Sequence, residues 1–264
     1  MFYFLKLGGS LITDKNQAHT ACLDIIHRLA DEIASARKEK PNLKLLLGHG
    51  SGSFGHVPAK KYGTREGVNN PEGWLGFEEV WKEARSLNQI MIDVLTSHNL
   101  PVISFSPSSM VITENKTIKT WDLTPIKKAL DTGLIPLIYG DVIFDLYIGG
   151  TIFSTEELFI PLANFLKPDK ILIAGIEEGV WQDYSAHQQL ICQITQKTDP
   201  KILKQLRGSN SIDVTGGMVE KVKSMLSLTA LLPDLEINIF SGAIPDNVRK
   251  SLNGVNLGTR IKRA

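Results

Sequence analysis

Short apolar runs alternate with longer amphipathic stretches along this chain. The apolar runs predict buried strands at 2–7, 43–47, 102–105, 135–139, 170–174 and 237–240. A further run at 142–148, followed by Gly149 and Gly150, predicts part of a hairpin. Strands that alternate with helices are typical of an α/β fold, so we expect a mostly parallel sheet.

The amphipathic stretches have the spacing of helices. They predict helices at 18–39, 72–98, 154–165, 199–207 and 215–232. Ser154 and Glu157 have the spacing of a capping box, which marks the start of the third helix. Asp199 and Pro200 suit the N-cap and the first position of the fourth. No linker or repeat interrupts the pattern. We expect one continuous compact domain whose halves, 1–153 and 154–264, meet at one cleft.

Composition narrows the class of protein. The chain has 264 residues, of which 42% are hydrophobic and 22% charged, as in an ordinary soluble enzyme. A net charge of +1 argues against a general nucleic-acid or membrane surface. No apolar run approaches the roughly 20 residues of a membrane span. Cys22 and Cys192 lack metal-type spacing and suit a reducing compartment, so we expect a cytoplasmic protein.

Three glycine-rich turns are the strongest chemical signal. The first follows a strand at 6–10, the second follows another at 48–56, and the third, at 213–218, precedes Lys221. Closely spaced glycines let backbone N–H groups approach an oxyanion, although each glycine alone is also explained by a positive-φ turn. The three turns together predict a site that holds several phosphates.

Two common nucleotide motifs are disfavoured. Gly50 to Gly55 matches G-x-G-x-x-G by letter, but that motif needs a helix at its third glycine, and the next helical pattern begins near Glu72. A Walker A loop needs a G-K-[ST] triplet, which is absent from the sequence. Ser10, Ser51 and Ser53 have no evident Asp/Glu–His relay, which favours direct in-line transfer over a covalent intermediate.

At this point a family resemblance is specific. Residues 6–10 with Thr13-Asp14-Lys15 resemble the N-terminal motif of the amino acid kinase superfamily, and 48–56, ending in His56, resembles its isopentenyl phosphate kinase family in particular. Further matches at 139–142, 213–221 and 258–259 extend the resemblance over almost the whole chain.

The resemblance implies a fold and a reaction. The fold would be a three-layer αβα sandwich. The reaction would be ATP-dependent phosphorylation of isopentenyl phosphate to isopentenyl diphosphate, in isoprenoid biosynthesis. It further implies Mg²⁺ held mainly by the ATP phosphates, a small isoprenoid monophosphate and ATP as the partners, and a homodimer.

Transfer between two anions needs cations that converge on the moving group. Lys6 leaves the first strand beside Gly8 and is well placed for this, unless it is only a solvated strand-end lysine. The resemblance implies that Lys15 also contacts the transferring phosphate and that Lys221 contacts ATP. The implied nucleotide site comprises Lys6, Gly8, Gly9, Ser10, Gly175, Asp213, Thr215, Gly216, Gly217 and Lys221.

On the acceptor side, His56 has a donor for a phosphate oxygen. The resemblance implies that it binds the acceptor phosphate and selects phosphate over carboxylate. The implied acceptor site adds Gly50, Ser51, Gly52, Ser53, Gly55 and Asp141. His49 either orients this loop or touches a ligand. Asp141 either contacts the acceptor or a lysine, or is a hairpin-turn aspartate.

A hydrocarbon acceptor also needs an apolar wall. The stripe that begins with Trp74 and Phe77 follows the phosphate loop, and it is either that wall or core packing. No arginine cluster stands out for an amino-acid carboxylate or a nucleoside monophosphate, which favours a small apolar phosphate.

One departure from the superfamily leaves alternatives open. Relatives carry an aspartate that orients the catalytic lysines, where this chain has Glu156 and Glu157. Either glutamate replaces it, or the segment is only a helix cap. The alternatives to an isopentenyl phosphate kinase are therefore another kinase of this fold, acting on a phosphonate antibiotic, a nucleoside monophosphate or an amino acid, and a nucleotide-binding regulator without catalysis.

Overall fold

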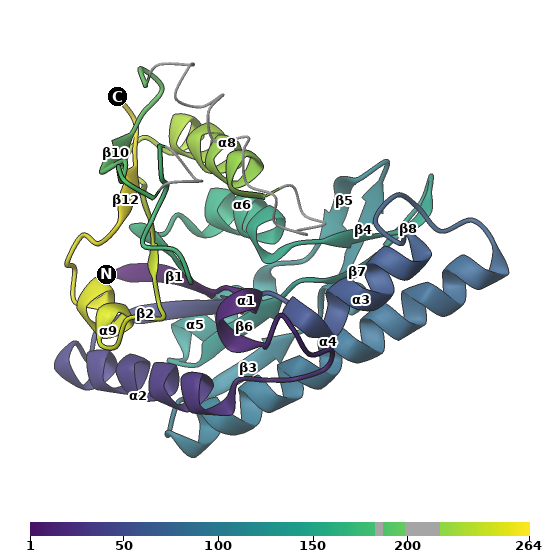
Figure 1. Ribbon diagram of the computed structural model, residues 1–264, viewed down its shortest axis with the longest axis horizontal. Coiled ribbons are helices and arrows are strands. Elements are labelled where there is room, and N and C mark those ends of the chain that lie inside the picture. The colour runs from purple at the N-terminus through teal and green to yellow at the C-terminus, as the bar shows by residue number, and fades with distance from the viewer. Residues whose placement is uncertain (183–186, 199–216) are drawn as a thin grey trace.

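The computed structural model of the chain describes residues 1–182, 187–198 and 217–264 (Figure 1). Its strands are β1 (Phe2–Leu7), β2 (Lys44–His49), β3 (Val102–Phe105), β4 (Val111–Glu114), β5 (Thr117–Trp121), β6 (Ile135–Tyr139), β7 (Asp141–Asp145), β8 (Gly149–Phe153), β9 (Lys170–Gly175), β10 (Gln193–Ile194), β11 (Glu236–Ser241) and β12 (Thr259–Ile261). Its helices are α1 (Gly9–Ile12), α2 (Leu23–Glu39), α3 (Gly52–Tyr62), α4 (Pro71–Ser97), α5 (Thr124–Asp131), α6 (Thr155–Leu166), α8 (Gly217–Leu231) and α9 (Asn247–Leu252), with a 3₁₀ turn at Pro107–Ser109.

The central sheet has eight strands in the order β10-β12-β11-β9-β1-β2-β6-β3. Its pairs are parallel except for β11 with β12, so the mostly parallel sheet predicted from the sequence is confirmed. In the central strands β1, β2 and β9, the carboxyl ends lie at one edge, because Leu7 pairs with both His49 and Ala174. Ligands bind parallel α/β sheets at this edge.

Side chains of the central sheet alternate between two cores. Leu5 and Leu7 pack with α1, α2, α4 and α9, whereas Phe4 packs with α5, α6 and α8 on the opposite face (Figure 1). This alternation is the strand period of two, and it produces the three-layer αβα arrangement. Since Lys6 follows Leu5, its side chain belongs to the face of Phe4, which α6 and α8 cover.

A second sheet has four strands in the order β5-β4-β7-β8. β7 and β8 form the predicted hairpin. Asp145 ties its turn to the neighbouring β4–β5 turn, because its carboxylate accepts the backbone N–H groups of Asn115, Lys116 and Ile148. This sheet packs beside α4, through a small apolar cluster that contains Phe77, Val80 and Val142.

Two predictions from the sequence need correction. The helix expected to begin at residue 18 begins at Leu23. A helix that the sequence did not predict, α3, begins at Gly52 inside the second glycine turn. Glycine and proline both disfavour a helix, so its glycines and Pro58 conceal the helical pattern in the sequence. In the structure, Pro58 nevertheless lies in the interior of α3. The argument that no helix opens at this turn is therefore wrong, and the dinucleotide motif loses that objection. The helix expected at 199–207 lies outside the described residues.

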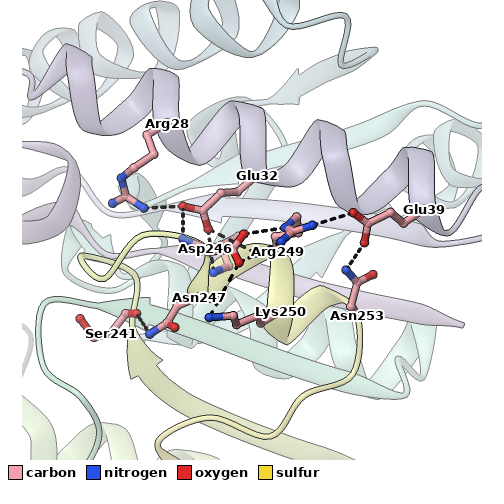
Figure 2. A network of polar contacts seen from close by, with 10 residues as sticks. Arg28, Glu32, Glu39, Ser241, Asp246, Asn247, Arg249, Lys250 and Asn253 are labelled. Carbon is pink, nitrogen blue, oxygen red and sulfur yellow. Dashed lines mark hydrogen bonds and ion pairs between the residues drawn. The ribbon is translucent and has the colours of Figure 1, made fainter.

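Glu32 of α2 caps the helix α9 (Figure 2). Its carboxylate accepts the N–H groups of Asp246 and Val248, each at 2.9 Å. The N-cap residue of α9, Asp246, makes no capping hydrogen bond with its own side chain, so Glu32 satisfies the start of the helix instead. Arg28, which pairs with Glu32, donates to the carbonyl of Gly242 at 2.7 Å. Gly242 in turn donates to Gly175 at 2.8 Å, so the network supports the end of β9.

Among the helices of the described residues, none combines the length and apolar character that a membrane span requires.

Candidate active site

Lys6, Glu156 and Lys221 form a cluster of charges, in which Lys6 and Glu156 are buried and Lys221 is half-buried. The ammonium of Lys6 contacts the Oε1 atom of Glu156, and the Nζ atom of Lys221 lies 3.3 Å from the same oxygen. Lys6 comes from β1, Glu156 from the first turn of α6 and Lys221 from the first turn and a half of α8. Residues far apart in the sequence therefore meet at the carboxyl edge of the sheet.

The close approach of α6 depends on Gly48, which is the neighbour of Lys6 in β2. A Cβ atom on Gly48 would lie 2.6 Å from Cγ2 of Thr155 and 2.7 Å from the ring of Phe159. The hydroxyl of Thr155 donates to the carbonyl of His49 at 2.6 Å and holds the start of the helix there. The next residue of α6, Glu156, is thereby brought to Lys6.

Two effects act on the carboxyl of Glu156 in opposite directions. Burial raises its pKa, but the positive charges of Lys6 and Lys221 outweigh burial and hold the pKa at about 2. Glu156 is therefore ionised at neutral pH. With two lysines and one glutamate, the cluster keeps a net positive charge, which favours phosphate.

The neighbouring Glu157 has a different task. It completes the predicted capping box, since it accepts the backbone N–H of Ser154 at 2.7 Å. Its carboxylate also pairs with Arg65 at 2.9 Å. Of the two glutamates that the sequence left open, Glu156 pairs with Lys6 and Lys221, and Glu157 pairs with Arg65.

The first and second glycine turns touch one another. A Cβ atom on Gly9 would lie 2.5 Å from the backbone nitrogen of Gly52, and one on Gly50 would lie 2.9 Å from that of Gly9. Gly52 has a φ of +50°, and a Cβ atom there would collide with Thr13. At all three positions glycine is required for the close approach, and at Gly52 it also suits the left-handed backbone.

Thr13 joins the two turns, a role that the sequence analysis missed. Its hydroxyl donates to the carbonyl of Gly9 at 2.7 Å and accepts the N–H of Ser53 at 3.0 Å. The position of Thr13 in the Thr13-Asp14-Lys15 motif was the available signal, but the motif does not say which atoms the hydroxyl meets.

Some of the predicted backbone donors are used inside the fold. The N–H of Gly8 donates to Ala174 at 2.8 Å, and that of Gly50 donates to Leu7 at 3.1 Å. The N–H of Ser53 likewise donates to the hydroxyl of Thr13, so the N–H groups of Gly8 and Ser53 both have acceptors inside the fold. The N–H groups of Gly9, Ser10 and Gly52 lie in first turns of helices, where no intrahelical acceptor exists.

His49 is buried and orients the loop. Its ring nitrogens lie 3.2 Å from the carbonyl oxygen of Gly50 and 3.2 Å from Oδ1 of Asn88, and its ring stacks on Tyr139 with centroids 5.5 Å apart. Burial lowers the pKa of His49 to about 4, and the charge of Lys6 acts in the same direction. His49 is therefore neutral at physiological pH. Of the two roles considered for it, the structure favours orientation of the loop.

Asp141 begins β7 beside this network. It is buried, and its carboxylate accepts the N–H groups of Ser108 at 3.1 Å and Val142 at 2.9 Å. Burial raises its pKa to about 6, against the lowering effect of those hydrogen bonds. These contacts are those of a turn-anchoring aspartate.

The remaining candidates lie around this centre. His56 is half-buried, one turn into α3, and Lys15 is exposed in the loop between α1 and α2. Trp74 and Phe77 lie on the first turns of α4, where both rings contact Phe144. Gly175 ends β9. Asp213, Thr215 and Gly216 lie outside the described residues, and for Gly217 only its position at the start of α8 is described.

No group of three or more His, Cys, Asp or Glu side chains within residues 1–182, 187–198 and 217–264 could hold a metal ion. The side chains described here therefore do not form a metal cage.

Comparison with known proteins identifies the family of this chain. The model of the amino acid kinase family matches residues 1–230. The chain is 37% identical over 270 residues to the isopentenyl phosphate kinase of Methanocaldococcus jannaschii, covering 99% of this chain and 98% of that protein. It is 31% identical over 268 residues to the isopentenyl phosphate kinase of Methanothermobacter thermautotrophicus, covering 97% of each.

A solved X-ray structure of an isopentenyl phosphate kinase matches the fold with a TM-score of 0.84, at 28% sequence identity and covering 99% of this chain and 100% of that one. The chain therefore belongs to the amino acid kinase family. Within that family it groups with the isopentenyl phosphate kinases, and the resemblance seen in its motifs is confirmed.

Proposed function

We propose that this chain is an ATP-dependent kinase that phosphorylates isopentenyl phosphate to isopentenyl diphosphate. The observation that carries the proposal is the cluster of Lys6, Glu156 and Lys221, at the edge of the sheet where the first glycine turn begins. Cations from the two halves, 1–153 and 154–264, meet there, as transfer between two anions requires.

The reaction is a direct in-line transfer. An oxygen of the acceptor phosphate attacks the γ-phosphorus of ATP, the bond from that phosphorus to the β,γ-bridging oxygen breaks, and ADP leaves with the bridging electrons. Lys6 contacts the transferring group and Lys221 the nucleotide phosphates, while Glu156 keeps both ammonium groups aimed at the site. The N–H groups of Gly9, Ser10 and Gly52 complete the set of donors.

The acceptor phosphate binds on the side of α3, where His56 donates to one of its oxygens. The hydrocarbon tail extends toward Trp74 and Phe77, whose position beside Phe144 and the β7–β8 hairpin supports an apolar wall. Lys15 approaches the transferring group from the loop that begins at Thr13.

Mg²⁺ supplies charge neutralisation to the phosphates when it is bound. Because the described side chains form no metal cage, the ion would reach the site on the nucleotide phosphates and water. We also propose a homodimer, in line with the family resemblance, which sedimentation would test.

The alternative of a non-catalytic regulator rested on the missing aspartate. Glu156 pairs with both lysines, so that departure no longer favours the alternative. The deciding experiment measures ADP release with isopentenyl phosphate, a nucleoside monophosphate, a phosphonate and glutamate as acceptors. The proposal expects turnover with isopentenyl phosphate far above the rest. Turnover with another acceptor alone, or with none, would refute it.

A further inference from the structure

The two ends of the loop that carries Lys15 lie side by side. Thr13 and Ala21 form an antiparallel bridge. The N–H of Asp14 donates to Thr20 at 2.9 Å, and that of Cys22 donates to Ile12 at 2.9 Å. These backbone contacts therefore fix both ends of the segment 14–20, but they do not determine where the middle of the loop lies.

Within the loop, the side chains of Asp14 and Thr20 form hydrogen bonds with the backbone of the loop itself. Asp14 accepts the N–H of Asn16 at 2.8 Å, and the hydroxyl of Thr20 donates to the carbonyl of Ala18 at 3.0 Å. Such turns shape the loop without attaching it to the rest of the protein.

His19 makes the contacts that reach outside the loop. Its Nδ1 atom contacts the carboxylate of Glu83 on α4, and its ring packs on the ring of Phe54 with centroids 4.4 Å apart. Phe54 lies in the first turn of α3, two residues after Gly52. Figure 1 shows the segment between α1 and α2 passing close to α3 and α4.

The backbone of His19 also departs from the ordinary conformations. Its φ is +54°, in the left-handed region that residues other than glycine rarely adopt. A strained residue persists where its surroundings hold it in place. Here the contacts with Glu83 and Phe54 do so.

We propose that His19 is a positioning residue, which holds the 14–20 loop against α3 and α4 so that Lys15 stays beside the transferring phosphate. The inference rests on the proposed function, because it takes the role of Lys15 from there. It adds that His19 is a second link between the catalytic loop and the acceptor-binding helix α3, besides the hydrogen bond from the N–H of Ser53 to the hydroxyl of Thr13.

A double-mutant cycle tests whether His19 acts through Lys15. We expect His19→Ala to lower kcat with isopentenyl phosphate about tenfold, with little change in the KM for ATP or in Tm. In a Lys15→Ala background the same change should lower kcat less than about twofold. Losses that multiply, or an unchanged kcat in His19→Ala, would overturn the inference.

Two glutamates on one face of α4 supply a matched pair of variants. Glu83→Gln removes the charge that meets His19, and it should reproduce part of the loss. Glu79→Gln, one turn earlier, removes a charge that pairs with Lys61 outside the loop, and it should leave kcat unchanged. Equal effects of the two variants would contradict a specific role for the His19–Glu83 pair.

A measurement that needs no activity separates this inference from the proposed function. Trypsin cleaves after lysine, and Lys15 lies in the loop. Cleavage after Lys15 in the native protein, followed by mass spectrometry, should be several-fold faster in His19→Ala than in the parent or in Glu79→Gln. An unchanged cleavage rate would show that His19 does not hold the loop, whatever acceptor the enzyme uses.

Discussion

The Oε1 atom of Glu156 contacts the ammonium of Lys6 and lies 3.3 Å from Nζ of Lys221. One carboxylate oxygen therefore lies between two cations that would otherwise repel each other. In the proposed function, this carboxylate keeps the two lysines in place beside the phosphates without neutralising both. This relationship leads to the first prediction.

Glu156→Gln keeps the shape of the side chain and removes its charge. We expect kcat to fall at least about tenfold, or ~1.4 kcal/mol, because the lysines lose the group that orients them. Glu157→Gln is the matched control: it should lower Tm through the cap and the Arg65 pair, and leave kcat within about twofold. Steady-state kinetics and thermal melting of both variants check this. Equal losses of kcat would show that Glu156 has no special part in catalysis.

Lys6→Ala should abolish turnover, because it removes charge stabilisation from the transition state. The backbone of β1 and its pairing with β2 and β9 do not depend on this side chain, so circular dichroism should report an intact fold. A variant that keeps turnover within about tenfold of the parent, roughly 1.4 kcal/mol, would contradict the role assigned to Lys6.

His56→Ala should affect the acceptor much more than ATP. We expect a higher KM for isopentenyl phosphate or a lower kcat, with nearly unchanged ATP affinity, since the ring donates to the acceptor phosphate. His56→Gln retains a donor and should recover part of the loss. Calorimetric titration measures the affinity for ATP, and steady-state kinetics measure KM and kcat for isopentenyl phosphate. Equal weakening of both substrates would argue against a histidine on the acceptor side.

Trp74→Ala and Phe77→Ala should broaden acceptance toward longer isoprenoid monophosphates, because each removes a ring from the proposed tail wall. Phe77 is buried, so its variant should also lose about 3 kcal/mol of stability, whereas the half-exposed Trp74 should lose less. A competition assay with acceptors of increasing length reads the preference. An unchanged preference in both variants would assign these rings to core packing alone.

Asp141 should make the protein less stable as the pH rises from about 4 to 6. Its folded pKa of about 6 lies above the ordinary aspartate pKa of 3.8, so the folded state holds a proton that the unfolded state has released. Two pKa units correspond to about 3 kcal/mol. Denaturant unfolding across this range should show the decline, and Asp141→Asn should flatten it. A parallel pH profile for the variant would exclude Asp141 as the cause.

Glu156 changes the stability of the protein in the opposite direction, and it does so at lower pH. Its folded pKa of about 2 lies below the ordinary glutamate pKa of 4.5, so its contribution to stability is present above pH 4.5 and is lost as the pH falls toward 2. The two carboxyl groups therefore affect stability in different pH ranges, and one series of denaturant unfolding experiments across pH measures both effects.

Much of the fold could be predicted from the sequence, because a period of two or 3.6 residues says which face of its own element a side chain occupies. Strand β1 and the long helix α4 were found in this way, within one residue at either end. The glycine turns and Lys6 were found because glycine and lysine have a restricted chemistry beside a strand end. Helix α3 escaped because glycine and proline hide the helical period.

Only the tertiary structure decided between Glu156 and Glu157. Adjacent residues on a helix point about 100° apart, and the sequence does not say which direction faces β1. The docking of α6 over Gly48 turns Glu156 toward Lys6 and leaves Glu157 to the cap. The sequence determined the elements and the chemistry available on them, because these depend on local pattern. The partners were decided by packing, because it brings together residues distant along the chain.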